Sequence, residues 1–205
     1  ALPPQRFLAG AAGCGRPLPG VELRCLAPRG ALELRCARLS PGWLAAGELQ
    51  PLPTGPKGWW RSGDAGRLGP QGLELLGRLD GAIHSGGETV FPEQLEQRLM
   101  ATAAPADLPL QAVLMLAVED AEWGQRLVAL VRPRPAADAG DLLARLQGLC
   151  ATWTPAERPR RWVLCPELAP TPLGKWQRGR WQRWLRALEA GHSDHSTCAD
   201  EHLQR

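Results

Sequence analysis

Three short segments of the chain carry the side chains best suited to chemistry. Asp64 follows a serine and a glycine, Arg78 and Asp80 share the segment Gly77–Asp80, and Lys175 follows a glycine in a proline-rich loop. An aspartate carboxylate can accept hydrogen bonds from two hydroxyl groups at once, and a lysine ammonium is a compact charge on a flexible stem. Taken singly, each residue also fits an ordinary role, as a turn aspartate, a surface arginine or a solvated lysine.

Two predicted strands must position the first two segments. A strand that contains Trp59 and Trp60 is expected to end at Ser62–Asp64. Gln71-Gly72 then predicts a hairpin turn, and the apolar run at residues 73–76 predicts a second strand that ends just before Arg78.

A glycine pair and a helix follow these strands. A short strand at Ala82-Ile83 leads to Gly86-Gly87, which favours a tight turn because glycine adopts backbone conformations that other residues avoid. Pro92 stands where a first helical residue is favoured, and Leu95 and Leu99 lie four apart on one helix face.

Taken together and in order, these segments resemble the adenylate-forming ligases, the family that joins a carboxylic acid to AMP and then usually to coenzyme A. The matching residues are Arg61-Ser62-Gly63-Asp64, Gly77-Arg78-Leu79-Asp80, the run from Gly86-Gly87-Glu88 through Pro92 to Glu96, and Gly174-Lys175 with Arg178. Gly15–Gly20 is also similar to the segment that follows the family's adenine-binding residues. Ala31 and Cys36 depart from the family's pattern in the hairpin that comes next.

The resemblance implies a role for each of these residues. Asp64 and Arg78 would bind the ribose of the nucleotide, and Lys175 would be the catalytic residue that reaches the α-phosphate and the carboxylate of the acid. Asp80 would be the hinge about which the C-terminal domain rotates between two half-reactions. Gly86-Gly87 would line the tunnel for coenzyme A. The implied substrates are ATP with Mg²⁺, coenzyme A and a small carboxylic acid.

The remaining sequence predicts further strands and helices. Residues 21–26 and 31–37 alternate apolar and polar side chains as a hairpin does, whereas residues 1–20 and 40–57 are rich in proline and glycine and are expected to be loops. Helices are expected after Asp138 or Asp141 and along the apolar face of Trp181, Trp184, Leu185 and Leu188. The other predicted strands are residues 113–118, 127–132 and 161–165.

The predicted fold class is α+β. Residues 1–79 are expected to be a small β-barrel-like remnant of the family's large AMP-binding domain. Residues 80–190 would form its compact, mobile α+β C-terminal domain, and residues 191–205 a disordered tail.

Composition and charge exclude several classes of protein. The chain has 205 residues, 44% hydrophobic and 22% charged, and its net charge of +3 is too small to imply nucleic acid by itself. No apolar run approaches the ~18 residues of a membrane span and no signal-peptide pattern opens the chain, so a cytoplasmic protein is expected. The six scattered cysteines include no Cys-x-x-Cys pair, which fits reduced thiols better than disulfides or a zinc site.

Three other segments allow functional interpretations that the residues do not favour. The glycines between Gly10 and Gly20 suggest a phosphate loop, but no strand precedes them and no Gly-Lys-Ser/Thr ends them. The basic and aromatic run at residues 175–186 could bind nucleic acid, but its tryptophans share one helix face and therefore fit a core. Near the end of the sequence is a group of three histidines and one cysteine. Only a helix would align these residues as metal ligands, and chain ends usually fray. That group is His192, His195, Cys198 and His202.

The chain begins with Ala1, which indicates that residues are missing upstream. The family's phosphate loop and adenine-binding segment are not in this sequence, so we expect the chain alone to be unable to form an acyl-adenylate. Two other functions stay open. One is an amino-acid-adenylating domain of a peptide synthetase, and the other is a non-catalytic interaction module with the same fold. The oligomeric state is open as well.

Overall fold

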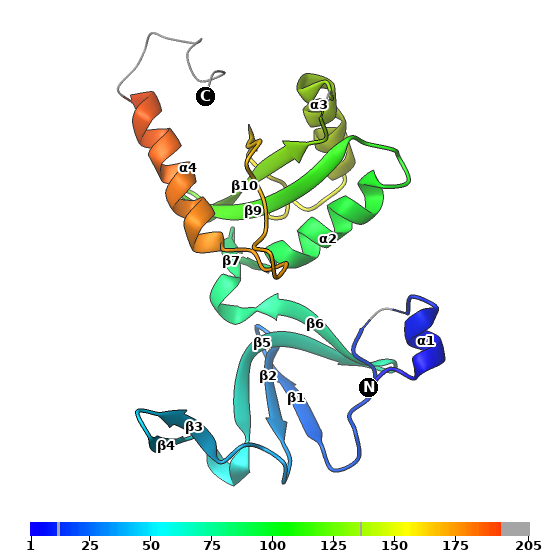
Figure 1. Cartoon of the computed structure of the whole chain (residues 1–205), viewed down its shortest axis with the longest axis vertical. Helices are drawn as coiled ribbons and strands as arrows, with labels where there is room; N and C mark the ends of the chain where they lie inside the picture. The colour runs from blue at the N-terminus through cyan, green and yellow to red at the C-terminus, as the bar shows by residue number, and fades with distance from the viewer. Residues whose placement is uncertain (12, 136, 194–205) are drawn as a thin grey trace. The chain divides into compact units, whose positions relative to one another are not determined.

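The computed structural model describes residues 1–11, 13–135 and 137–193 (Figure 1). The fold is mixed α/β with a curled, half-barrel sheet, which confirms the predicted class to that extent. The chain forms two compact units, Ala1–Gln97 and Arg98–Arg205. The predicted domain boundary after Leu79 stays a prediction.

The first unit is built on an antiparallel sheet in the order β1-β2-β5-β6. Its strands are β1 (Glu22–Leu26), β2 (Ala31–Arg35), β5 (Trp60–Gly69) and β6 (Gly72–Arg78). The predicted hairpin of the first two strands is confirmed, and the β5–β6 turn lies at Pro70-Gln71, one residue earlier than predicted. Register shifts in the β2–β5 and β5–β6 pairs mark bulges, which bend a sheet and account for its curl.

The prediction that a strand ends at Ser62–Asp64 is wrong, because β5 runs through these residues. Ala31 pairs with Ala65 and Glu33 pairs with Arg61, so three residues of β5 lie opposite the single residue Leu32 of β2. Gly63, inside this bulge, has a φ of +83° that glycine adopts without strain. The bulge interrupts the alternation of side chains between the two faces of the strand. For this reason the sequence predicts the end of a strand there.

The prediction of loops at residues 40–57 and 1–20 is also incomplete. A second hairpin, β3 (Gly42–Ala45) with β4 (Glu48–Pro51), projects from the first unit, and a single helical turn, η1 (Pro56–Gly58), follows it (Figure 1). The hairpin turns at Ala46-Gly47, where both residues have positive φ, as a two-residue β-hairpin turn requires. A five-residue helix, α1 (Pro4–Leu8), lies in the first loop.

The stretch after β6 contains the predicted short strand, glycine turn and helix, and in addition a second strand that was not predicted. A helical turn, η2 (Leu79–Gly81), leads to the short hairpin of β7 (Ile83–Ser85) and β8 (Glu88–Val90). Helix α2 (Pro92–Ala103) begins at the proline that the sequence singled out. Leu95 and Leu99 are both buried, as their spacing predicts.

The second unit contains three paired strands together with helices. Strands β9 (Leu110–Asp120) and β10 (Gly124–Pro133) are antiparallel, and β11 (Arg161–Leu164) pairs with β10 in parallel. A parallel pair needs a crossover, and α3 (Ala139–Cys150) lies in this one. The Asp138 side chain accepts a hydrogen bond from the amide of Asp141 at 3.0 Å, so the predicted helix cap is confirmed.

Helix α4 (Arg178–Ser193) contributes two fully buried side chains, Trp181 and Leu185, to the core of the second unit. Trp184 and the segment's other tryptophan, Trp176, pack at the margin of this core. The tryptophans of residues 175–186 are therefore packing residues, as their spacing indicates. The other buried members of the cluster are Leu114, Leu116, Val128, Leu130, Cys165 and Leu168.

Helix α4 continues to Ser193, three residues into the segment expected to be a tail, and residues 194–205 lie outside the described part of the chain. The predicted tail and its His and Cys residues from His195 onward are therefore not described. Among the residues that are described, no helix is long and apolar enough to cross a membrane.

Candidate functional site

Asp64, Arg78 and Asp80 lie together on the first unit. Asp64 on β5 pairs with Arg78 on β6, so the fold places the two side chains directly across from one another. Arg78 Nη1 lies 3.6 Å from Asp64 Oδ1, while Arg78 Nε and Nη2 donate to the two carboxylate oxygens of Asp80 at 3.1 and 2.8 Å. One guanidinium thus bridges two carboxylates.

The hydrogen bond from Arg78 holds the pKa of the Asp80 carboxyl below its ordinary value, and the same bond raises the pKa of Arg78. Both side chains are mostly open to solvent, whereas the Asp64 side chain is only one-third exposed. Asp64 is bound to Arg78 through one oxygen at a distance longer than a hydrogen bond, so its carboxylate keeps acceptor capacity for hydroxyl groups.

Gly63 makes room for this cluster. A Cβ on Gly63 would lie 3.2–3.4 Å from the guanidinium atoms of Arg78, on a backbone whose φ already excludes most side chains. The hydroxyl of Ser62 fixes the same bulge, because it accepts a hydrogen bond from the Asp64 amide at 3.1 Å and donates to the Leu32 carbonyl at 3.4 Å. The segment Ser62–Asp64 is therefore shaped by local contacts of its own.

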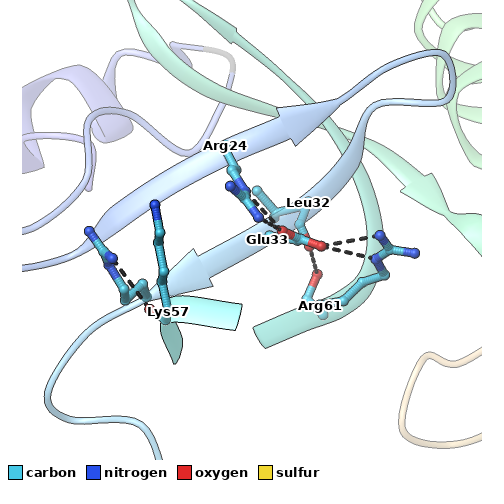
Figure 2. Close-up of polar contacts among 7 residues, drawn as sticks. Arg24, Leu32, Glu33, Lys57 and Arg61 are labelled. Atoms are coloured by element: carbon cyan, nitrogen blue, oxygen red, sulfur yellow. Dashed lines mark hydrogen bonds and ion pairs between the residues drawn. The ribbon is translucent and has the colours of Figure 1, made fainter. Parts of the chain in front are cut away.

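Next to the bulge, Glu33 joins three strands (Figure 2). Its carboxylate accepts hydrogen bonds from Arg24 on β1 at 2.6 and 2.8 Å and from Arg61 on β5 at 3.1 and 3.3 Å. Glu33 is 8% exposed, and the guanidinium of Arg24 also lies 4.2 Å from the centroid of the Trp59 ring. These contacts hold the start of β5, one residue before Ser62, against β1 and β2.

The Glu33 network predicts an acid-sensitive term in the stability of the chain. Hydrogen bonds from Arg24 hold the pKa of the Glu33 carboxyl below its ordinary value of 4.5. A lowered carboxyl pKa stabilises the fold above the unfolded-state pKa, and this contribution is lost as the pH falls through the folded-state value. Urea denaturation at pH values from 7 down to about 3 should therefore show a smaller acid-induced loss of stability for Glu33→Gln than for the unsubstituted chain.

Partner variants provide the control for this prediction. Arg24→Ala should reduce the acid-sensitive term more than Arg61→Ala, because the bond from Arg24 is the larger cause of the lowered pKa. Equal pH profiles for Glu33→Gln and the unsubstituted chain would show that Glu33 does not carry the term.

Gly86 and Gly87 form the turn of the β7–β8 hairpin, where Ser85 pairs with Glu88. Both glycines have positive φ, at +57° and +83°, which is the requirement of a two-residue hairpin turn. A Cβ on Gly87 would contact nothing within 4 Å among the described residues. Only the positive φ of the turn therefore favours glycine at this position. The role in a coenzyme A tunnel stays a prediction.

Lys175 lies on the second unit, in the loop between β11 and α4, with its side chain exposed. Its amide donates to the Thr171 hydroxyl at 3.1 Å. Arg178, three residues further on, donates from Nη1 to the buried carbonyl of Met115 at 2.8 Å. The sequence analysis did not identify Glu33 or Thr171 as residues that support the site. Their hydrogen-bond partners come close to them only once the strands and the loop have formed.

The buried thiols do not offer nucleophilic chemistry. Burial raises the pKa of the Cys150 thiol to about 11 and that of Cys165 to about 12, so both stay protonated near neutral pH. Within the described residues, no group of three or more His, Cys, Asp or Glu side chains could hold a metal ion. The candidates for chemistry among the described residues therefore stay those that the motifs single out, Asp64, Arg78, Asp80 and Lys175.

Comparison with known proteins identifies related sequences. No family model matches the sequence. The chain is 33% identical to a 2-succinylbenzoate–CoA ligase of Salmonella typhimurium over 180 residues, which cover 83% of the chain and 35% of that ligase. It is 36% identical to a 4-chlorobenzoate–CoA ligase of a Pseudomonas species over 111 residues, covering 53% and 20% of the two chains.

Solved structures give the same result. Wild-type E. coli MenE, with a bound analogue of OSB-AMS, superposes with a TM-score of 0.63 at 28% identity and covers 86% of this chain, which matches 36% of that protein. The chain is thus related in sequence and fold to the C-terminal portion of the adenylate-forming ligases, as the motifs indicate. The particular relatives that recur in both comparisons are the 2-succinylbenzoate (o-succinylbenzoate)–CoA ligases. The chain spans about a third of the length of these relatives.

Proposed function

We propose that this chain is the C-terminal part of an ATP-dependent acid–CoA ligase. The observation that carries the proposal is the pairing of Asp64 with Arg78 across β5 and β6, in motifs that match the family in order and spacing. The relatives at about 30% identity are CoA ligases, which supports the same reaction class.

The proposed reaction has two half-reactions. In the first, a carboxylate oxygen of the acid attacks the α-phosphorus of ATP, and pyrophosphate leaves. In the second, the thiol of coenzyme A attacks the acyl carbon, and AMP leaves. Negative charge builds on the phosphate oxygens in the first step, where a correctly placed cation stabilises the transition state most.

Each candidate residue has a part in this scheme. Asp64 would accept hydrogen bonds from the two ribose hydroxyls while Arg78 donates to the same sugar. Lys175 would bring its ammonium to the α-phosphate and the acid carboxylate. Asp80 would be the hinge residue that absorbs the backbone change between the half-reactions, and Gly86-Gly87 would leave room for the pantetheine arm.

The acid we propose is o-succinylbenzoate, which would place the protein in menaquinone or phylloquinone biosynthesis. Two observations support this choice: the segment from Ser85 to Pro92, with Asp80 at the predicted hinge, is similar to that of o-succinylbenzoate–CoA ligases, and such ligases recur among the relatives. Another acyl- or aryl-CoA ligase is the alternative, because a 4-chlorobenzoate and an indoleacetate–CoA ligase are also among the relatives.

We propose a cytoplasmic location and Mg²⁺ as the ion that accompanies ATP. The described residues include no group of three or more His, Cys, Asp or Glu side chains that could hold a metal ion, so Mg²⁺ would be bound chiefly by the phosphates of the nucleotide.

A hybrid ligase tests the proposal. It joins the part of the Salmonella ligase upstream of the matched region to this chain. With 2-succinylbenzoate, ATP and coenzyme A, the folded hybrid should release AMP and pyrophosphate and form the CoA thioester, whereas the chain alone should form neither. Asp64→Ala should lower kcat/KM for ATP by about 10- to 100-fold, the effect of losing hydrogen bonds that hydroxyl groups donate to a charged acceptor.

Glu74→Ala is the matched control for this variant. Glu74 is an exposed carboxylate on β6 that pairs only with the exposed Arg67 in the contacts described, so its loss should leave kcat/KM unchanged. A hybrid that unfolds cooperatively on heating but forms no acyl-adenylate from any of the acids above would contradict the proposal. Pyrophosphate release with amino acids instead would favour the amino-acid-adenylating alternative, and a hybrid insensitive to Asp64 and Lys175 substitutions would favour the interaction module.

A further inference from the structure

The loop that carries Lys175 closes on itself through three hydrogen bonds. The Thr171 amide donates to the Lys175 carbonyl at 2.9 Å, and the Gly174 amide donates to the Thr171 carbonyl at 2.8 Å. The third bond runs from the Lys175 amide to the Thr171 hydroxyl at 3.1 Å. Thr171 thus binds both backbone groups of Lys175, the carbonyl through its own amide and the amide through its side chain.

The residues after Lys175 are anchored as well. Trp176 packs against the core cluster of the second unit, and Arg178 donates to the carbonyl of the fully buried Met115 at 2.8 Å. Lys175 therefore lies between a closed turn and an anchored segment, and it is exposed to solvent. The proline and glycine content of the loop suggests a flexible backbone. The contacts instead indicate an ordered backbone at Lys175 that carries a flexible side chain.

Resting on the function proposed above, we propose that Thr171 is a positioning residue for Lys175. Its hydroxyl fixes the lysine amide, so the ammonium is presented from a backbone that is already ordered. A disordered loop would have to lose conformational entropy as the transition state forms, and a pre-ordered one would not. Thr171 touches no substrate in this proposal and acts only through Lys175.

Amide exchange in this 205-residue chain tests the geometry without any assay of activity. Thr171→Val keeps the shape of the side chain and removes the hydroxyl, whereas Thr171→Ser keeps the hydroxyl. By NMR, the Lys175 amide should exchange about tenfold faster in Thr171→Val, since one hydrogen bond is lost. It should exchange at the unsubstituted rate in Thr171→Ser. The Gly174 amide, which donates to a backbone carbonyl, is the internal reference.

Kinetics of the hybrid ligase test the role in catalysis. Thr171→Val should lower kcat for acyl-adenylate formation by about tenfold and leave KM for ATP and for the acid unchanged, because the lysine is misplaced and the substrates are not. Thr171→Ser should restore kcat. Thioester formation from a supplied acyl-adenylate should not change, since Lys175 is not assigned to that step.

The outcomes separate this inference from the proposed function. The inference is wrong if the Lys175 amide exchanges at the same rate in Thr171→Val and Thr171→Ser. It is also wrong if this amide is not protected from exchange in the unsubstituted chain. Faster exchange with an unchanged kcat overturns the positioning role, provided that Lys175→Ala lowers kcat in the same hybrid. If Lys175→Ala leaves kcat unchanged, the proposed function fails, whatever the exchange data show.

Discussion

Lys175→Ala in the hybrid ligase should lower the rate of acyl-adenylate formation by about 10²- to 10³-fold, the range seen when one preorganised group that stabilises transition-state charge is removed. The second half-reaction, started from a supplied acyl-adenylate, should stay close to the unsubstituted rate. Rapid-quench measurement of each half-reaction checks the two expectations separately.

The composition of the chain provides a matched control. Lys57 and Lys175 are the only lysines among 24 basic residues, so Lys57→Ala removes the same group elsewhere. Lys57 lies on the first unit, where its carbonyl accepts a hydrogen bond from Arg35 at 3.3 Å, and its substitution should leave both half-reactions unchanged (Figure 2). Lys175→Arg should also be slow, because a planar guanidinium does not replace a compact ammonium. An adenylation rate that is equal in the Lys175 and Lys57 variants would remove Lys175 from the mechanism.

Trp181→Ala should cost about 3–5 kcal/mol of unfolding free energy, the usual cost of truncating a buried aromatic side chain. Trp181 is 2% exposed and packs with Leu185 and strands β9 and β10 in the core of the second unit. Urea denaturation of the chain, followed by circular dichroism, measures the effect.

Two variants control for the change of side chain. Trp43 on the β3–β4 hairpin is 51% exposed, so Trp43→Ala should cost less than about 1 kcal/mol. Trp181→Phe should cost much less than Trp181→Ala, partly because the buried indole Nε1 has no hydrogen-bond partner among the described residues that phenylalanine would forfeit. Similar losses for Trp181→Ala and Trp43→Ala would show that Trp181 does not hold the core together.

The elements that follow simple periodicity or capping rules were predictable. The hairpin of β1 and β2, the helix start at Pro92 and the cap at Asp138 depend on residues near one another in sequence. The β3–β4 hairpin was not predictable from its composition, because its proline and glycine residues hide a two-residue turn at Ala46-Gly47.

The candidate site was predictable in its residues but not in its contacts. The motifs single out Asp64, Arg78 and Asp80, yet the bidentate bond between Arg78 and Asp80 depends on how the chain turns after β6. The bulge at Ser62–Asp64 interrupts the strand pattern just where Asp64 is positioned. The Glu33 network depends on strand register, which aligns residues from β1, β2 and β5 that the sequence holds far apart.

The parallel pairing of β11 with β10 has a consequence for how the second unit forms during synthesis. Strands β9 and β10 are consecutive and joined by a short turn, so they can pair as soon as both have left the ribosome. Their central residues are buried on both faces in the finished unit, but the helix that contributes Trp181 and Leu185 is made after the other described elements of the unit. The nascent hairpin therefore exposes an apolar surface throughout the synthesis of α3 and β11. We expect the unit to be most open to aggregation during this interval.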